Sequence, residues 1–482
     1  MPRPAPRDGR VAVLPGRQTW YARRVLRVTF LRLGRISTLA FAVTCASVAG
    51  HAGAQEAKPA LMSRPIAYTD VADAFEPGDP IDVAVHLGFL RSWQGGTIQR
   101  EVVDESSGDG RSSRHLIDVA EHSQTSNVLA LSLDVGVYHD LMVFVRMPIV
   151  LGQDEELQPP RDGCQVASTR PRCQALNEPV AGEPVPLFDL ARPLTSARRS
   201  GLRSVDFGVA WGVMNQYRTV YLPTWVLRIE GSVPAGRTMH ACTSDACNPG
   251  ISRGTAHVKL ESRWSYRYRL FEPYFGIAHT YEWVTRGDSV FYPAGRLAGV
   301  VNDAPPSVTE GTLGVGFIPW EDRGHYQRFE LDLQSQAVYL SAGRDFSPLF
   351  DALGTSDNPH LSKPNLVAPE GPAPHTSVPF TGITNVEAHA RLGLSAALAI
   401  QAARYVRFGL GLGISFLTSH LITGAPPCNG DVDAKPDDPR VGTCISGISN
   451  PVYRPAIDAP GRRFRLAAAT DVQFAAAATG AF

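Results

Sequence analysis

Beyond its first 54 residues, the sequence has no long apolar run. No stretch of about 18 or more apolar residues, the length that suggests a membrane-spanning helix, occurs there in this chain of 482 residues. This argues against a helical membrane protein. The mean hydropathy of −0.10 does not exclude a membrane β-barrel, because barrel strands alternate lipid-facing with lumen-facing residues and their average stays low.

The sequence also lacks an excess of charge of either sign. Its 46 Lys and Arg residues balance 46 Asp and Glu residues, so the formal net charge is zero. Nothing in this balance favours a nucleic acid as partner, since binding to a phosphate backbone requires a basic surface. The sequence contains no phosphate-binding, dinucleotide-binding or zinc-protease motif, and it predicts no cofactor.

The N-terminus has the pattern of an export signal. A basic region with five arginines at 23–35 precedes an apolar stretch of mostly small residues at 36–50. The Ala-Gly-Ala sequence at 52–54 then forms a small-residue cleavage site. This pattern predicts a cleaved signal peptide over residues 1–54 and export from the cytoplasm. The alternative is a single membrane anchor.

Six of the seven cysteines follow this predicted signal peptide and fall into three close pairs. Each pair lies within one stretch rich in Gly, Pro and Asp between apolar segments. An even number of short-range pairs after a signal peptide predicts loop-closing disulfides in an oxidising compartment. A zinc site is the alternative, but no His or further Cys stands at the required spacing. The predicted pairs are Cys164 with Cys173, Cys242 with Cys247, and Cys428 with Cys444.

Twelve segments alternate apolar with polar or small residues, which predicts β-strands with two different faces. In the segment 405–419, for example, Phe408, Leu410 and Leu412 alternate with Arg407, Gly409, Gly411 and Gly413. The predicted strands are 81–90, 127–137, 141–151, 202–215, 219–233, 255–268, 271–284, 308–320, 326–340, 384–400, 405–419 and 464–482.

The connections between these segments are short and long in turn. Short connections follow every second strand, as at His139-Asp140 and Arg269-Leu270, whereas the others are long, the longest being 152–201. Short turns at one end and long loops at the other are typical of outer-membrane barrels. The fold class predicted is therefore all-β: a transmembrane, antiparallel, up-and-down barrel of about 12 strands over residues 80–482. Residues 55–79 are interpreted as a short periplasmic N-terminal segment.

Aromatic residues gather near the short turns, where they predict a girdle at the membrane interface. The alternative is the general preference of aromatic residues for strands. The residues are Tyr138, Tyr217, Tyr221, Tyr266, Tyr268, Phe271, Trp320, Tyr326 and Tyr405.

The last predicted strand runs from Phe464-Arg465-Leu466 to a C-terminal aromatic, Phe482, and its apolar residues share one phase. With the signal peptide and the strand pattern, this end resembles Gram-negative outer-membrane β-barrel proteins in the broad porin and small-solute-transporter sense. The resemblance covers nearly all of 80–482. It implies a location in the bacterial outer membrane, contact with its lipid, and recognition of Phe482 as an assembly signal by the barrel-insertion machinery.

Charged side chains on the polar face cannot face lipid, where Arg or Lys at mid-depth costs about 2–4 kcal/mol. They are therefore predicted to line the lumen. The sequence favours an outer-membrane channel or transporter that passes small solutes through a narrow charged lumen. The alternative is a non-conducting structural or surface-recognition barrel that acts through its long loops. The candidates for lining the lumen are Arg146, Arg228, Glu230, Lys259, Glu261, Arg263, Arg328, Glu330, Asp332, Glu387, His389, Arg391, Arg407, Arg465 and Asp471.

Glycines on the same polar face predict bare parts of the lumen wall. Gly409, Gly411 and Gly413 do so on one strand, and Gly208 and Gly212 on another. A bare wall beside a charged wall leaves space for a solute, or for a loop folded inward.

An outer-membrane lipid hydrolase is a third reading. The segment Glu121–Asn127 contains the residue types of a serine-hydrolase site. However, His122 and Ser123 are adjacent, and neighbouring side chains on a strand point to opposite faces. The sequence therefore predicts no enzyme and no metal site.

Overall fold

The structure is a computed structural model that describes residues 64–76, 79–104, 113–160, 174–190, 192–244, 246–367, 375–430, 444, 448–467 and 469–482. The predicted signal peptide and the Cys164/Cys173 pair lie outside these residues. Among the described residues, no helix is both long enough and apolar enough to cross a membrane.

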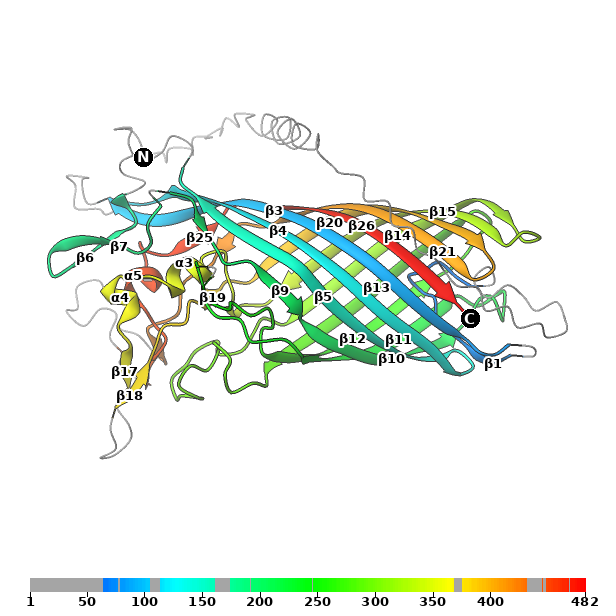
Figure 1. Cartoon of the computed structure of the whole chain (residues 1–482), viewed down its shortest axis with the longest axis horizontal. Coiled ribbons are helices and arrows are strands. Elements are labelled where there is room, and N and C mark those ends of the chain that lie inside the picture. Colours follow the sequence, from blue (N-terminus) through cyan, green and yellow to red (C-terminus); the bar gives the residue numbers. More distant parts are fainter. Residues whose placement is uncertain are drawn as a thin grey trace, which may run out of the picture. The chain divides into compact units, whose positions relative to one another are not determined.

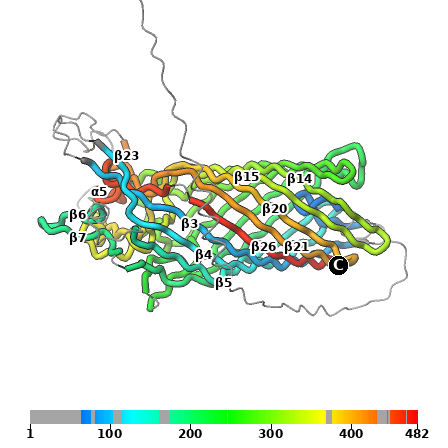
Figure 2. The backbone as a smooth tube through the Cα atoms, turned by 90° about the horizontal axis from the view of Figure 1, so that it is seen from above, coloured from blue at the N-terminus to red at the C-terminus, as the bar shows by residue number. Residues whose placement is uncertain are grey.

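The unit Gln55–Phe482 is built on a closed antiparallel barrel of twelve strands, as predicted (Figures 1 and 2). Each strand pairs with its neighbours in chain order, and the last, β26, closes the ring by pairing with the first, β3. The strands are β3 (Val83–Asp104), β4 (Ser113–Tyr138), β5 (Leu141–Gln158), β10 (Ser204–Met214), β11 (Thr224–Pro234), β12 (Thr255–Ser265), β13 (Phe271–Val284), β14 (Val308–Asp322), β15 (Gln327–Leu340), β20 (His389–Ala403), β21 (Val406–Leu417) and β26 (Ala469–Ala481).

The pairing register confirms which side chains share a face. Leu313, Ile277 and Leu412 are among the most exposed apolar residues, at 64%, 62% and 64%. They belong to the apolar phase of their strands, and the polar phase points inward. Exposure of this kind along a closed barrel is the lipid-facing surface of a membrane barrel.

The turn between β4 and β5 shows how the chain keeps this phase. Both strands direct odd-numbered residues outward, so facing residue numbers must sum to an even number and the loop must contain an odd number of residues. The turn His139-Asp140 contains only two, but the register shifts between Gly136 and Tyr138. This bulge adds the missing residue. Between β12 and β13 the outward phase changes from even to odd, and the two-residue turn after Tyr268 needs no bulge.

Most of the predicted girdle residues are exposed near the short turns, including Tyr138, Tyr221, Tyr268, Phe271 and Trp320. Tyr217 differs, because its hydroxyl accepts a hydrogen bond from Arg267 in a partly buried position. The small hairpin of β1 (Ala74–Glu76) and β2 (Asp79–Ile81) lies at this end too, next to His139.

At the other end the long connections form an ordered body, here called the loop cap (Figure 1). Strands β3, β4 and β5 extend well past their predicted ends to support it. Its elements are β6 (Asn177–Val180), β7 (Glu183–Pro186), β8 (Leu194–Thr195), β9 (Arg199–Leu202), β16 (Gly343–Asp345), α3 (Phe350–Gly354), α4 (Pro359–Ser362), β17 (Asn365–Val367), β18 (Thr376–Val378), β19 (Thr384–Val386), β22 (His420–Leu421), β23 (Cys428–Asn429), β24 (Ile448–Ser449), α5 (Pro455–Asp458) and β25 (Phe464–Leu466).

The loop cap has its own apolar core, in which Ile98, Leu187, Leu349 and Phe464 are fully buried together. Burying one such side chain contributes about 1.5–3 kcal/mol.

Two buried arginines in and beside the loop cap form ion pairs. Arg199 donates to Asp351 at 2.6 Å, and Arg100 pairs with Glu178. Burial raises the pKa of Asp458 to about 6, although three backbone N–H groups that donate to its carboxylate, including that of Gly424, act in the opposite direction.

Two of the predicted disulfides fall within the described residues, and both are present. Cys242 bonds to Cys247 and Cys428 to Cys444, each within one connection of the loop cap. Their Cα–Cα distances of 6.3 and 5.7 Å lie in the usual range. Neither bond joins barrel strands.

The topology makes a prediction about sidedness. With the loop cap outside the cell, surface proteolysis of intact cells should cut first within 152–201 or 353–379, because loops are the accessible segments. The fragments can be located by mass spectrometry. Cleavage at the turn His139-Asp140 instead would mean that the barrel is inserted in the opposite direction.

Candidate functional site

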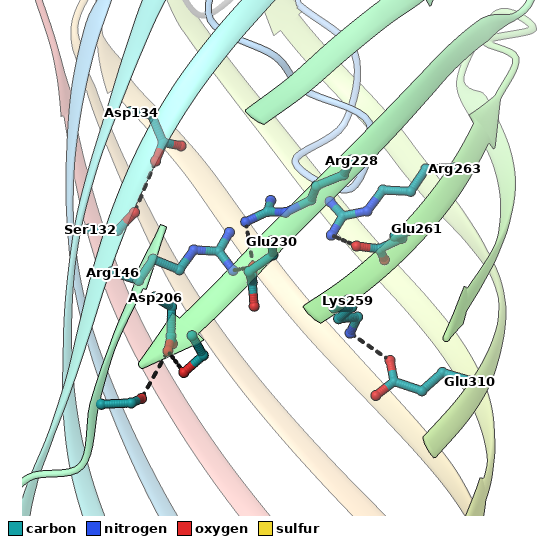
Figure 3. Close-up of polar contacts among 12 residues, drawn as sticks. Ser132, Asp134, Arg146, Asp206, Arg228, Glu230, Lys259, Glu261, Arg263 and Glu310 are labelled. Carbon is teal, nitrogen blue, oxygen red and sulfur yellow. Dashed lines mark hydrogen bonds and ion pairs between the residues drawn. The ribbon is translucent and has the colours of Figure 1, made fainter. Parts of the chain in front are cut away.

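The interior of the barrel holds a group of paired charged side chains (Figure 3). On one side of the lumen, Arg146 of β5 and Arg228 of β11 both approach one carboxylate oxygen of Glu230, at 3.5 and 3.0 Å. Both guanidinium groups also lie over the ring of Phe144, 5.1 and 3.7 Å from its centroid. Alternation along β5 and β11 places these residues on one face, and the register brings the strands together through β10.

The charged wall continues on the next strands. Arg263 donates to Glu261 at 2.7 Å on β12, and Lys259 reaches Glu310 of β14 at 2.9 Å. Both pairs point into the interior in Figure 3. Since each charge is paired, this wall carries cations and anions without a large net charge.

A second shared carboxylate lies on β15. Arg407 donates a hydrogen bond to one carboxylate oxygen of Glu330 at 3.0 Å, and Arg328 forms an ion pair with the same oxygen, also at 3.0 Å. Arg328 and Glu330 are buried. Next to them, the hydroxyl of Tyr274 donates to Asp332 at 2.8 Å. These contacts link β13, β15 and β21 along the inner wall, each over one intervening strand.

Arg391 and Asp471 lie on barrel strands. Arg391 is opposite Leu417 in β21, and Asp471 of β26 accepts a hydrogen bond from Gln473 at 2.6 Å.

The other candidates lie where the barrel meets the loop cap. Glu387 accepts the backbone N–H of Leu421, and Arg465 is in β25. His389 begins β20 and stacks on His420, with ring centroids 3.7 Å apart.

The opposite part of the lumen wall carries no charge over two register rows, here called the apolar patch. One row crosses six neighbouring strands at Val150, Val128, Leu90, Ala475, Gly411 and Ala397. The row nearer the short turns crosses them at Pro148, Ala130, Gly88, Ala477, Gly409 and Ala399. Leu90, Ala130 and Ala477 are exposed although they face inward, so the lumen is open at this level.

Polar rows frame the apolar patch on both sides along the barrel. Toward the short turns the next row includes Arg146, His86 and Arg407, and toward the loop cap it includes Ser92 and Gln473. At its β20 edge the patch meets acidic residues, because Ala397 and Ala399 are opposite Asp332 and Glu330.

Residues 64–76, here called the N-terminal segment, lie across the lumen near the short turns. The carbonyl of Arg64 accepts from Arg328 at 3.1 Å, the carbonyl of Tyr68 accepts from Arg263 at 2.8 Å, and Thr69 contacts Ser265 at 2.8 Å. The sequence placed these residues in a segment before the barrel. No local pattern could show their position, because these three partners on the barrel wall are about 195 or more residues away in the chain.

Glycines on the lumen face make room for this segment. A Cβ at Gly276 would overlap the hydroxyl of Tyr68, and one at Gly316 would overlap Ile66. Tyr68 also packs on Tyr274, with ring centroids 4.6 Å apart. The segment therefore fits notches in the wall.

The expectation of a bare wall on β10 is wrong. At Gly208 the ring of Phe144 and the backbone oxygen of Ile229 occupy the space of a Cβ, and at Gly212 the side chain of Asp140 does. A glycine on the inward face thus indicates either open space or a close neighbour, and only the neighbouring strands decide which. The glycines of β21 do leave open space.

The structure does not support the hydrolase hypothesis, because His122 and Ser123 are not placed to act together. His122 is buried and its Nε2 contacts Glu155 at 2.9 Å, whereas Ser123 is exposed on the other face of β4. A nucleophilic serine needs its base within hydrogen-bond reach, and Ser123 has no such path to His122.

No protein-family model matches the sequence, and no curated protein is similar to it. Solved structures with a similar arrangement include the COG4313 outer membrane channel from Pseudomonas putida F1, with a TM-score of 0.36 and 11% identity over 85% of this chain and 100% of that chain. A Pseudomonas aeruginosa FadL homologue has a TM-score of 0.32 and 8% identity, over 88% and 98%. The CymD monoaromatic hydrocarbon channel has 0.30 and 9%, over 83% and 88%. At these TM-scores the likeness carries no argument, and the fold rests on the register above.

The fit of Tyr68 and Ile66 against Gly276 and Gly316 predicts that these glycines are needed to hold the N-terminal segment in place. The substitution Gly276→Leu should displace it, because the new side chain takes the space of Tyr68. Maleimide labelling of Ala72→Cys, a buried position, should become at least several times faster in that background. Gly311→Leu is the matched control, since Gly311 pairs with the outward Ile277 and its Cβ would meet no close neighbour. Equal labelling in the two backgrounds would contradict the fit.

Because two arginines share the carboxylate of Glu330, we expect its replacement to lower stability strongly. Glu330→Gln should lower the free energy of unfolding by about 3–5 kcal/mol, because it leaves two guanidinium groups without their buried counter-charge. Lys259→Gln should lower it by less than about 1 kcal/mol, because its pair with Glu310 is partly exposed. Urea unfolding in lipid vesicles can measure both. Equal effects would show that burial of the pair does not matter.

Proposed function

We propose that the protein is an outer-membrane channel or transporter for small solutes. The observation that carries this proposal is the open lumen at the apolar patch, where inward-facing Leu90, Ala130 and Ala477 are exposed. A barrel filled with packed side chains would bury them. A twelve-stranded barrel is also narrower than the barrels of 16–18 strands that leave a wide aqueous channel, so the solutes are small.

The charged wall supports weak preference between ions. Cations and anions alternate on it, and most are paired within 3.5 Å. A solute passing this wall meets both signs in sequence, which favours passage without strong selection for one charge.

Two features support the second candidate, a non-conducting barrel that acts at the cell surface. The loop cap is packed around its own core, and the N-terminal segment lies across the lumen near the short turns. If neither moves, the lumen is closed at both ends and the loops carry the function.

Localisation belongs to the same proposal. The export signal at 1–54 delivers the chain to the periplasm, and Phe482 is read by the barrel-insertion machinery. In support, Phe482 is 72% exposed while its backbone pairs with Val83 at the closing seam of the barrel.

Conductance in planar bilayers tests the proposal. The mature protein should give small channels, and a variant without residues 55–76 should give larger or longer openings because the N-terminal segment is absent. The pair Arg391→Ala and Arg407→Ala should shift the reversal potential toward cation preference. Heat-modifiable mobility on gels checks that each variant folds. If neither the mature protein nor the deletion variant conducts or passes solutes in proteoliposomes, the non-conducting alternative stands instead.

A further inference from the structure

We propose that the apolar patch binds the apolar face of an uncharged, ring-sized solute whose polar rim contacts the framing rows. This inference rests on the proposed function and names the class of solute. It assigns a binding role to a part of the lumen wall that carries no charge and no catalytic side chain.

Packing against the neighbouring strands does not require glycine at the inward-facing positions of β21. A Cβ at Gly409, Gly411 or Gly413 would meet its nearest neighbours at 3.8, 3.6 and 3.6 Å, which are ordinary contacts. The neighbouring strands would therefore accept alanine at each position. Glycine in a strand is less stable than alanine, so the wall gains nothing from these three glycines.

The glycines elsewhere on the lumen face are of a different kind. At Gly314 the space of a Cβ is taken by the ring of Tyr274, and at Gly208 by that of Phe144. Those positions require glycine because another side chain of the barrel fills the notch. At Gly409 and Gly411 the open side faces the lumen, and glycine in a strand marks a place where a ligand or backbone approaches closely.

The dimensions of the patch fit a ring. Val150 of the first row is only 1% exposed, so in that row the accessible patch spans the other five strands. At about 4.8 Å between strands they give a width of about 19 Å around the wall, and the two rows are about 7 Å apart along the strands. Its surface is made of Gly, Ala, Val, Leu and Pro, which leaves it smooth. A flat ring can therefore lie on it, and the apolar area that both surfaces remove from water favours binding.

The residues around the apolar patch determine which polar groups a bound solute can carry. Next to the patch, Asp332 and Glu330 present carboxylates at one edge, and the row toward the short turns presents Arg407, His86 and Arg146. Arg407 and Glu330 are paired with each other, as are Arg146 and Glu230. A charged solute would have to displace one of these partners. Hydroxyl and amide groups can instead hydrogen-bond to paired charges without breaking them.

Swelling of proteoliposomes tests this with three probes: methyl β-D-glucoside, phenyl β-D-glucoside and phenyl β-D-glucuronide. A simple sieve passes the small methyl compound fastest. We expect the phenyl glucoside to enter at least twofold faster than the methyl glucoside, despite its size, and faster than the charged glucuronide.

Two variants separate binding from simple obstruction. Ala475→Ser with Ala477→Ser adds hydroxyls with little volume, and it should bring the ratio of phenyl to methyl glucoside rates below one. Gly411→Leu fills the patch and should reduce phenyl glucoside entry at least fivefold. The matched control is Ala396→Leu, which adds the same side chain to the adjacent lipid-facing position and should change neither rate.

The possible failures are distinct. If the methyl glucoside enters fastest in the wild type, or if the serine variant keeps the wild-type ratio, the patch does not bind the solute although the barrel still conducts. Faster entry of the glucuronide would overturn the uncharged class. If no probe enters at all, and the variant without residues 55–76 is also impermeable, the proposed function itself fails.

Discussion

Closure of the backbone hydrogen bonds is the constraint on which the rest of this structure depends. In hydrocarbon no water can satisfy an N–H or C=O group, so a sheet that crosses a membrane cannot leave an edge unpaired. Here β26 meets that requirement by pairing with β3 over twelve consecutive positions, from Thr470 opposite Gly95 to Ala481 opposite Ala84. Once the ring is closed, each residue has only two directions, toward lipid or toward the lumen. The bulge between Gly136 and Tyr138 exists because a change of phase would turn a whole strand inside out.

The same constraint explains why the strands were predictable and the interior was not. Alternation is a local signal, and it identified all twelve strands, because lipid on one side and polar contacts on the other impose a period of two. The ends of β3, β4 and β5 were underestimated, since above the membrane these strands support the loop cap and no longer need a lipid-facing phase. The N-terminal segment was not recognised as part of the lumen, because Tyr68 and Arg64 find partners about 200 or more residues away.

Glycine shows where sequence reasoning about the lumen reaches its limit. Gly208 and Gly411 look equivalent in the sequence, each in an alternating strand and each facing inward. The structure separates them: Phe144, 64 positions earlier in the chain, fills the first, and nothing in the described wall fills the second. The difference depends on the register between neighbouring strands, which is set by turn lengths and bulges rather than by the residues themselves. Charged residues such as Arg146 and Glu230 could be assigned to the inward face, but their sharing of one carboxylate could not.

The division of the lumen into a charged wall and an apolar patch follows from the energetics of an interior that contains water. A long guanidinium side chain is stable there only if a carboxylate lies close by, so charges gather on neighbouring strands and leave the remaining wall without partners. The side chains on that remaining wall must then be uncharged, either small and polar or small and apolar. In this barrel the wall is apolar over six strands, between two polar rows, and inward-facing Leu90, Ala130 and Ala477 are exposed there. Water wets such a surface poorly, and a solute with an apolar face gains by displacing that water. The arrangement that stabilises the charges thus also creates a surface on which an uncharged solute can bind.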